Sequence, residues 1–278
     1  MKTQSNNLYI VSTPIGNLDD ITLRAIEVLK NSDIIVCEDT RHSFKLLNHL
    51  KIKKKLISYH KFNERKKVSE IIQHINQGKI LSLISDAGTP LLSDPGRLLL
   101  NECIKRKINI IPIPGVSSIT SAISVSGFSD QFLFYGFLPK TENELNKTLK
   151  TLSQNFFSII FFIPAIKVNF YLKNFQTYFS GRKIMIGREI TKIHESFYRE
   201  EIDNLKMFKK PLKGELTVVI SENYRNKVLD HEKITILAKK YLKKYSLKDT
   251  VDLIFHSEKI SKKKIYQICL KIKNEKSS

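Results

Sequence analysis

The sequence predicts an α/β protein with a mainly parallel N-terminal sheet, a mixed C-terminal sheet and a small helical C-terminal appendage. Three observations favour this class. Short apolar runs alternate with segments of helical hydrophobic period in the first half of the chain. In the middle, apolar runs follow one another at both helical and hairpin spacing. The last part, from residue 231, is lysine-rich and has helical period throughout.

The first half is expected to alternate strand and helix. Apolar runs of strand length predict five strands, and Val68, Ile71, Ile72 and Ile75 fall on one face of a helix between two of them. This alternation indicates a parallel sheet that is covered on both faces. We expect strands at 8–12, 34–37, 56–58, 80–84 and 109–112, and helices near 23–30, near 46–50, and at 64–77, 95–106 and 118–126.

Polar, glycine-containing loops follow three of these strands, at 13–17, 85–90 and 114–118. The carboxyl ends of parallel strands lie at one edge of a sheet, where ligands bind in open α/β folds, so we expect these loops to form one site. In the loop 85–90, small residues let backbone amides approach a ligand and Asp86 supplies a fixed acceptor, although an ordinary strand-to-helix turn is the alternative. Asp94 is predicted as the N-cap of the next helix, with Pro95 at its first position.

The second half begins at a junction over 127–140, and its mixture of spacings predicts a mixed sheet. The appendage carries 13 lysines and 5 acidic residues, and Ser246 and Ser261 are expected to cap two of its helices. It resembles a helix-turn-helix unit, with a solvated lysine-rich surface as the alternative. Domains are predicted at 1–126, 127–230 and 231–278, with strands at 132–137, 156–163, 183–187, 194–199 and 215–221, and helices at 142–153, 165–178, 231–244, 246–256 and 261–273.

The net charge of +20 favours nucleic acid as a partner, because lysine and arginine release counterions from phosphates. Lysine far outnumbers arginine, however, and an AT-rich genome would give the same bias. No apolar run is long enough to span a membrane, and the three cysteines lack CxxC spacing, so we expect a soluble cytoplasmic protein without membrane association or disulfides.

Several common site motifs are missing from the sequence. It has neither G-x-G-x-x-G after the first strand, nor G-x-x-x-x-G-K-[ST], nor G-x-S-x-G, which argues against a dinucleotide-binding Rossmann site, a P-loop and an α/β-hydrolase site. The histidines at 60, 74, 194 and 231 are scattered without metal-ligand spacing, so no metal site is predicted.

Six motifs together resemble the ribosomal RNA small subunit methyltransferase I family, a branch of the tetrapyrrole-methylase-like class III methyltransferases. Their order and spacing are kept over about residues 7–222, and more loosely beyond. The motifs are Thr-Pro-Ile-Gly-Asn-Leu-Asp-Asp-Ile at 13–21, Glu-Asp-Thr-Arg at 38–41, the segment 85–96, Pro-Ile-Pro-Gly-Val-Ser-Ser at 112–118, Phe-Tyr-Gly-Phe-Leu-Pro-Lys at 134–140, and Arg-Glu-Ile-Thr-Lys-Ile-His-Glu at 188–195.

The resemblance implies a two-domain, homodimeric enzyme that folds S-adenosylmethionine into the cleft between its domains. It also implies 2′-O-methylation of a cytidine ribose at position 1402 of 16S ribosomal RNA in the small ribosomal subunit. Pro14 and Gly115 could instead only shape turns, and Ser117 could only cap its helix. Carried over motif by motif, the cofactor-binding residues are Pro14, Asp86, Ala87, Gly88, Thr89, Ser117 and Ser118, with Phe162 and 214–215 as weaker candidates.

A ribose hydroxyl is a poor nucleophile, so a general base is expected. Glu38, Asp39 and Arg41 are the first choice, with a carboxylate taking the proton and Arg41 holding an RNA phosphate. A simple ion pair within this cluster is the alternative. Arg188 and Glu189 are the second choice, with an ion pair between them as the alternative. Lys140 and Lys213 are candidate phosphate contacts.

One segment departs from the family pattern. Relatives usually carry Tyr-Glu-Ser-Pro-His-Arg where this chain has Phe-Phe-Ile-Pro-Ala-Ile-Lys at 161–167. Either the acidic and arginine positions are dispensable, with Lys167 keeping a positive charge, or a contact from the second domain is weaker here. Two other functions stay open: methylation of a tetrapyrrole carbon, and a non-catalytic ribosome-assembly protein that holds RNA.

Overall fold

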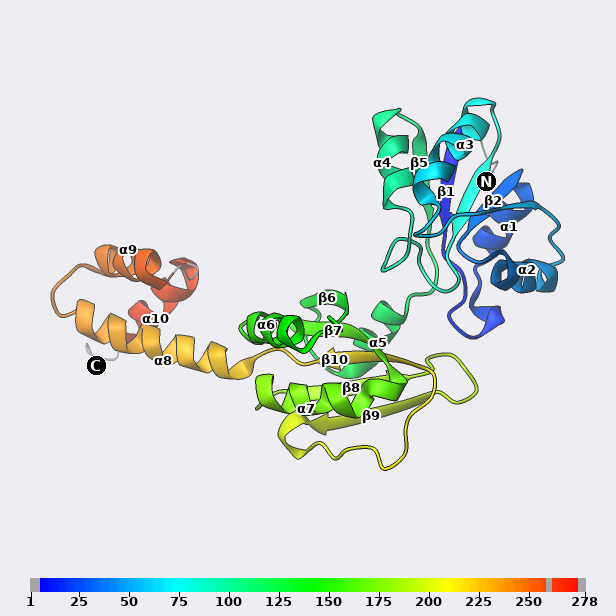
Figure 1. Cartoon of the computed structure of the whole chain (residues 1–278). Helices are drawn as coiled ribbons and strands as arrows, with labels where there is room; N and C mark the ends of the chain where they lie inside the picture. Colours follow the sequence, from blue (N-terminus) through cyan, green and yellow to red (C-terminus); the bar gives the residue numbers. More distant parts are fainter. Residues whose placement is uncertain (1–5, 259–261, 275–278) are drawn as a thin grey trace.

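The computed structural model describes residues 6–258 and 262–274 and arranges them around two five-stranded sheets (Figure 1). A cluster of three helices follows the second sheet. The predicted α/β class is therefore confirmed, including the parallel first sheet, the mixed second sheet and the helical appendage. None of the helices within the described residues is long and apolar enough to cross a membrane.

The first sheet has the order β3-β2-β4-β1-β5, and all its neighbouring strands are parallel. Every residue of β1, β2 and β4 is buried, as expected where helices cover both faces of a parallel sheet. Each expected strand forms, with ends moved by one residue at most. The strands are β1 (Asn7–Val11), β2 (Ile34–Cys37), β3 (Lys55–Ser58), β4 (Leu81–Ile84) and β5 (Asn109–Ile113).

Two pairs of helices cover this sheet. On one face, α1 (Leu23–Asn31) and α2 (Thr40–His49) bury Leu29 and Leu47 in one core. On the other, α3 (Glu64–Asn76) and α4 (Arg97–Lys105) pack together and bury Leu99 in a second core. The short helix η1 (Leu18–Asp20) precedes α1.

The predicted start of the helix at 95–106 is wrong. The helix α4 begins at Arg97, and Gly96 takes the N-cap position with φ +136°, a backbone conformation that favours glycine. Because this turn falls two residues after Asp94, neither Asp94 caps the helix nor Pro95 opens it. The Asp94 side chain is therefore not used to cap this helix.

The second sheet has the order β6-β7-β10-β8-β9, with β6 and β7 parallel and the other pairs antiparallel. One face of this sheet is covered by α6 and α7, which share its main core. The strands are β6 (Phe132–Phe137), β7 (Ser158–Pro164), β8 (Lys183–Arg188), β9 (Ser196–Glu201) and β10 (Glu215–Ile220), and the helices are α6 (Glu142–Ser153), η2 (Ala165–Lys167), α7 (Val168–Tyr178) and η3 (Ile202–Asn204).

Helix α5 (Ser118–Ser126) follows the last strand of the first sheet but packs on the second sheet. Its Ile119 and Ala122 share a buried cluster with Ile160, Met185 and Val219 of β7, β8 and β10. The chain therefore changes cores just before α5, ahead of the proposed domain boundary between residues 126 and 127.

The appendage consists of α8 (Tyr224–Tyr241), α9 (Leu247–Glu258) and α10 (Lys262–Asn274), which share a separate apolar core. The Oγ of Ser246 accepts a hydrogen bond from the backbone N–H of Asp249 at 3.2 Å, which confirms Ser246 as a helix cap. The expected cap Ser261 lies outside the described residues. Helix α8 starts earlier than the predicted 231.

Candidate functional site

The loops that follow β1, β4 and β5 are joined by hydrogen bonds at one edge of the first sheet. Thr13 and Gly88 exchange backbone hydrogen bonds at 2.9 and 3.0 Å. The hydroxyl of Thr89 lies 3.1 Å from the Ser12 hydroxyl and donates to the carbonyl of Val116 at 3.3 Å. The parallel order of the strands thus brings the three predicted loops into contact.

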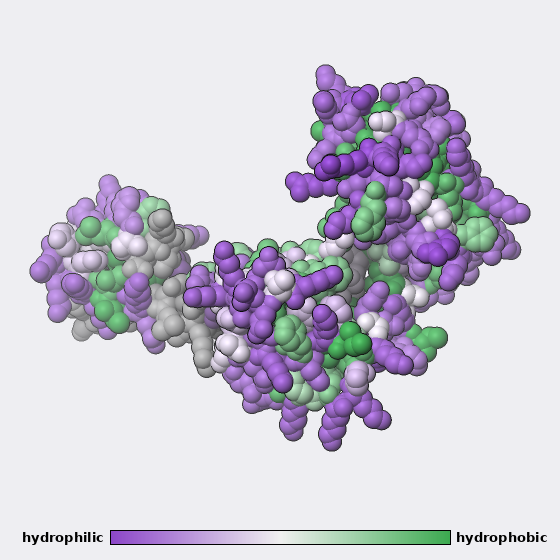
Figure 2. Space-filling model, in the orientation of Figure 1, coloured by the Kyte–Doolittle hydropathy of each residue, from purple (hydrophilic) through white to green (hydrophobic). Residues whose placement is uncertain are grey.

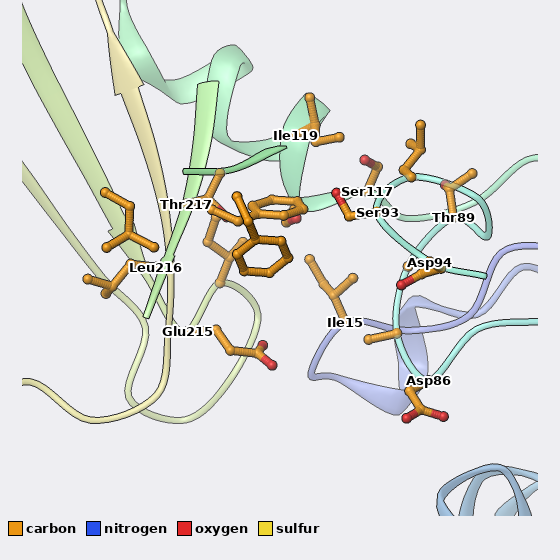
Figure 3. A pocket seen from close by; sticks show the side chains of 18 of the residues that line it. Ile15, Asp86, Thr89, Ser93, Asp94, Ser117, Ile119, Glu215, Leu216 and Thr217 are labelled. Atoms are coloured by element: carbon orange, nitrogen blue, oxygen red, sulfur yellow. The ribbon is translucent and has the colours of Figure 1, made fainter. Parts of the chain in front are cut away.

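A cavity of about 440 Å³ lies between these loops and the second sheet (Figure 3). The first half of the chain contributes small, polar residues and the second half contributes mostly apolar ones. The lining residues are Ile15, Asp86, Ala87, Gly88, Thr89, Leu92, Ser93, Asp94, Ser117, Ser118 and Ile119 on one side, and Phe137, Phe162, Ile163, Pro164, Ile190, Gly214, Glu215, Leu216 and Thr217 on the other.

The cavity brings together all the predicted cofactor-binding residues except Pro14. Pro14 is buried, and the next residue, Ile15, lines the cavity instead. Ser117 occupies the N-cap position of α5, but within the described chain its side chain makes no capping hydrogen bond and lines the cavity instead. Phe162 and the segment 214–215, the weaker candidates from the second half, also line it.

The three predicted catalytic residues follow β2, outside the residues that line the cavity. The backbone N–H of Asp39 donates to Oδ1 of Asp86 at 3.2 Å, so this cluster adjoins the cavity loop. The Arg41 side chain donates two hydrogen bonds to the Asp39 carboxylate, from Nε to Oδ1 at 3.1 Å and from Nη2 to Oδ2 at 2.7 Å. These bonds hold the pKa of Asp39 far below its usual range, which makes that carboxylate a weak base.

Two other carboxyl groups at this edge have raised pKa values. Burial raises the pKa of Glu38, and the nearby Asp86 adds to the effect. Burial, with the negative charges of Glu38 and Asp86, raises the pKa of Asp94 to about 6, against a smaller opposing effect of the Ser85 hydroxyl. The sequence analysis assigned Asp94 to a helix cap, because its Asp-Pro-Gly context matches a helix start, and so missed it as a site residue. Its position after a strand that ends at the same edge of the sheet could have indicated a place in the site.

The opposite wall contains aromatic rings. The rings of Phe137 and Phe134 pack against the ring of Phe162 at centroid distances of 5.4 and 5.1 Å. Phe137 is 59% exposed, so it presents its surface to the cavity rim. This wall can hold a flat, apolar ring.

Arg188 and Glu189, the second-choice catalytic residues, each have other partners, so the alternative of an ion pair between them gives way to a different network. Lys192 bridges Glu189 and Glu215, with its Nζ 3.0 Å from an oxygen of each. Although burial raises it, the pKa of Glu189 is lowered overall by hydrogen bonds from the Glu215 backbone and from Lys192. Arg188 donates to the Lys213 carbonyl at 2.9 Å. Glu189 therefore acts as a structural anion at the rim.

A hydrogen bond from the backbone of Asn17 to the hydroxyl of Thr191, 3.1 Å long, joins the first loop to the rim of the second sheet. The walls are thus tied together on one side of the cavity. An aromatic wall faces hydroxyls, close backbone and carboxylates, an arrangement suited to a ligand that carries both a flat ring and a positive charge.

Comparison with known proteins agrees with this geometry. A family model described as tetrapyrrole (corrin/porphyrin) methylases matches residues 7–206. Two curated relatives, both named ribosomal RNA small subunit methyltransferase I, are each 42% identical to this chain. The one from Thermotoga maritima aligns over 77% of this chain and 97% of its own, and the one from Rickettsia prowazekii over 96% and 98%.

Solved structures with the same fold are much more distant in sequence. The methyltransferase CobJ is 15% identical, with a TM-score of 0.60, over 77% of this chain and 93% of its own. A uroporphyrin-III C-methyltransferase from Thermus thermophilus, complexed with S-adenosyl homocysteine, is 13% identical, with a TM-score of 0.53, over 79% and 99%. At these identities the likeness establishes the fold alone.

Proposed function

This chain belongs to the tetrapyrrole methylase family and, within it, to the ribosomal RNA small subunit methyltransferase I family, and from this premise we propose that it methylates small-subunit ribosomal RNA with S-adenosylmethionine. The acceptor we propose is the ribose 2′-oxygen of a cytidine, at position 1402 of 16S ribosomal RNA. The observation that carries the proposal is the cavity in which the loops 85–90 and 114–118 face the second sheet.

The residues of the cavity fit S-adenosylmethionine. Its volume of about 440 Å³ is in the range of small-molecule sites. Phe137 and Phe162 offer a surface for a flat ring, and Asp86 and Asp94 offer negative charge to a sulfonium. When bound, S-adenosylmethionine supplies an electrophilic methyl group on positively charged sulfur. The structural relative with S-adenosyl homocysteine supports this choice of cofactor.

Several features support RNA as the acceptor. The net charge of +20 and the lysines of α8–α10 suit a polyanion. Figure 2 shows a hollow between these helices and the N-terminal lobe, with hydrophilic side chains on both sides of it. The Arg41 side chain is 88% exposed despite its bond to Asp39, and Lys140 and Lys213 are exposed, so all three can reach phosphates. A small anionic macrocycle would not need so wide a basic surface.

The test is to measure methylation of 16S ribosomal RNA in a strain from which the gene is deleted. We expect the 2′-O-methyl mark at the cytidine to disappear and to return with the wild-type gene. Asp86→Ala should not restore it, whereas Asp130→Ala should, because Asp130 is an exposed aspartate outside the residues that line the cavity. An unchanged mark in the deletion strain would overturn the proposal.

Purified protein separates the other two functions. A tetrapyrrole methyltransferase would methylate uroporphyrin-type substrates and leave ribosomal RNA unmodified. A non-catalytic RNA-holding protein would bind RNA but give no calorimetric signal with S-adenosylmethionine. We further propose a cytoplasmic homodimer, and light scattering that returned the 32.2 kDa mass of one chain would contradict the dimer.

A further inference from the structure

We propose that Asp94 is the general base of the reaction and takes the proton from the acceptor hydroxyl while the methyl group is transferred. This inference rests on the proposed function and deepens it. It differs from the sequence-based choice of Glu38, Asp39 and Arg41.

The position of Asp94 is fixed by an unusual loop. Between β4 and α4, Leu91 and Ser93 adopt φ values of +75° and +76°, and Gly96 adopts +136°. Non-glycine residues in this region cost free energy, and such strained positions cluster at active sites and ligand-binding loops. The strained loop turns Asp94 into the cavity wall, between Asp86 and Ser93 in Figure 3.

The second sheet braces this loop from the other side. Strand β6 has an irregularity between Phe134 and Gly136, where Gly136 adopts φ +85°. A Cβ atom on Gly136 would lie 3.1 Å from the Oγ of Ser93, the neighbour of Asp94. This close approach limits the movement of the loop at Ser93, directly before Asp94, and a group that transfers a proton must be held in place.

The other carboxyl groups near the cavity lie outside its wall, as Glu38 does, or have partners elsewhere. Asp39 is bound by Arg41 and lies outside the lining residues. Asp86 lines the cavity but accepts a hydrogen bond from the Asp39 backbone. Glu215 is paired with Lys192, and its side chain is 78% exposed. Asp94 lines the cavity and is partly buried. The groups that change its pKa include no cation.

The groups facing Asp94 favour a base that works near neutral pH. The negative charges of Glu38, after β2, and Asp86, after β4, raise its pKa, and the nearby Ser85 hydroxyl, which donates to the backbone carbonyl of Ala87, opposes this rise. His60 lies near Glu38 and partly offsets that charge. A pKa of about 6 leaves Asp94 ionised at neutral pH yet more basic than an ordinary aspartate.

The proposed step balances without another reactant. A lone pair of the ribose 2′-oxygen forms a bond to the methyl carbon, and the carbon–sulfur bond breaks with its electron pair going to sulfur. The hydroxyl proton becomes strongly acidic as the new bond forms, and Asp94 takes it and becomes neutral. The products are a methyl ether, a neutral thioether and a protonated Asp94, which releases its proton to water.

The test compares wild type, Asp94→Asn, Glu38→Gln and the control Asp130→Asn in single-turnover methylation of ribosomal RNA from pH 5 to 9. For wild type, the rate should rise with pH through about 6 and then level off. Asp94→Asn should be about 10²- to 10⁴-fold slower, without this rise, whereas Asp130→Asn should keep it. Glu38→Gln should also keep the rise but at a lower pH, because the charge of Glu38 helps to raise the pKa of Asp94. Rates are measured at saturating S-adenosylmethionine, because Asp94→Asn removes a negative charge from the cavity. Calorimetry should find its cofactor binding weakened by much less than the loss in rate, since Asn keeps the shape of the side chain and Asp86 remains in the wall.

A measurement on the free protein gives an independent readout. Carbon-13 NMR of aspartate carboxyl groups should contain one signal that titrates near pH 6 and is lost in Asp94→Asn. Titration of that signal near pH 4 would overturn the inference, as would a rate for Asp94→Asn within tenfold of wild type, or loss of the pH-dependent rise in Glu38→Gln. If wild type itself leaves ribosomal RNA unmethylated, the proposed function fails first and the inference falls with it.

Discussion

Replacing Asp94 by Asn should stabilise the protein at pH 8, even though it slows the reaction. The folded state holds the pKa of this carboxyl at about 6, above the usual 3.8, so the folded protein binds its proton more tightly than the unfolded chain does. Folding is therefore penalised once Asp94 ionises, and the penalty grows as the pH rises from about 4 to about 6. Asn carries no charge and avoids this penalty.

The magnitude follows from the difference between the two pKa values. A rise from 3.8 to about 6 corresponds to about 3 kcal/mol at high pH. Because Asp94 is only partly buried, solvent screening reduces this to about 1–1.5 kcal/mol. For a chain of this size, such a gain raises Tm by about 2–6 °C.

Thermal melts of wild type and Asp94→Asn at pH 8 and pH 4 measure this effect. We expect the higher Tm of the variant at pH 8 and nearly equal values at pH 4, where the wild-type carboxyl is protonated. Asp130→Asn controls for the loss of one exposed negative charge. A variant that is destabilised equally at both pH values would refute the reasoning, because Asp94 would then contribute through hydrogen bonds and not through its charge.

Two further predictions concern the core and the RNA-binding surface. Leu99→Ala should lower the free energy of unfolding, measured with urea, by about 2–5 kcal/mol, because Leu99 is fully buried between α4 and the first sheet. The control Leu98→Ala, at a 40% exposed position, should lower it far less, and equal losses would contradict the packing. Lys243 and Lys244 are exposed after α8, and replacing both by Gln should weaken binding to a ribosomal RNA fragment, measured by fluorescence anisotropy. The plot of log K against log salt should become less steep, by about 0.7–0.9 for each phosphate that is no longer neutralised. An unchanged slope would show that these lysines do not bind the RNA.

Local sequence pattern predicted most elements of this fold, because apolar period and turn residues act within a few positions. The strands of the first sheet and helix α5 form almost where expected, and Ser246 caps α9. Parallel order then predicted that the loops after β1, β4 and β5 would meet, since strand ends of one direction share an edge. These inferences need no knowledge of distant contacts.

The misses depend on contacts between residues that are far apart in the chain. The Asp94-Pro95-Gly96 sequence matches a helix start, but the helix begins at Arg97, after Gly96 with φ +136° and close to Leu83 and Leu91. The bridge from Lys192 to Glu215 joins separate segments, which the spacing within 188–195 could not predict. Helix α5 likewise follows the first sheet in sequence but completes the core of the second.

The distribution of charge connects the two halves of the proposed reaction. A protein with a net charge of +20 attracts RNA over long distances, but the same field repels a positively charged sulfonium. The carboxylates of Glu38, Asp86 and Asp94 reverse the sign locally, at the one edge of the sheet where the loops meet. Salt screens the long-range attraction within about 10 Å, while contacts inside the partly closed cavity are screened much less. Acidic residues at the cavity and lysines on the outer surface would therefore let one basic protein bind the proposed cationic methyl donor and the proposed polyanionic acceptor together.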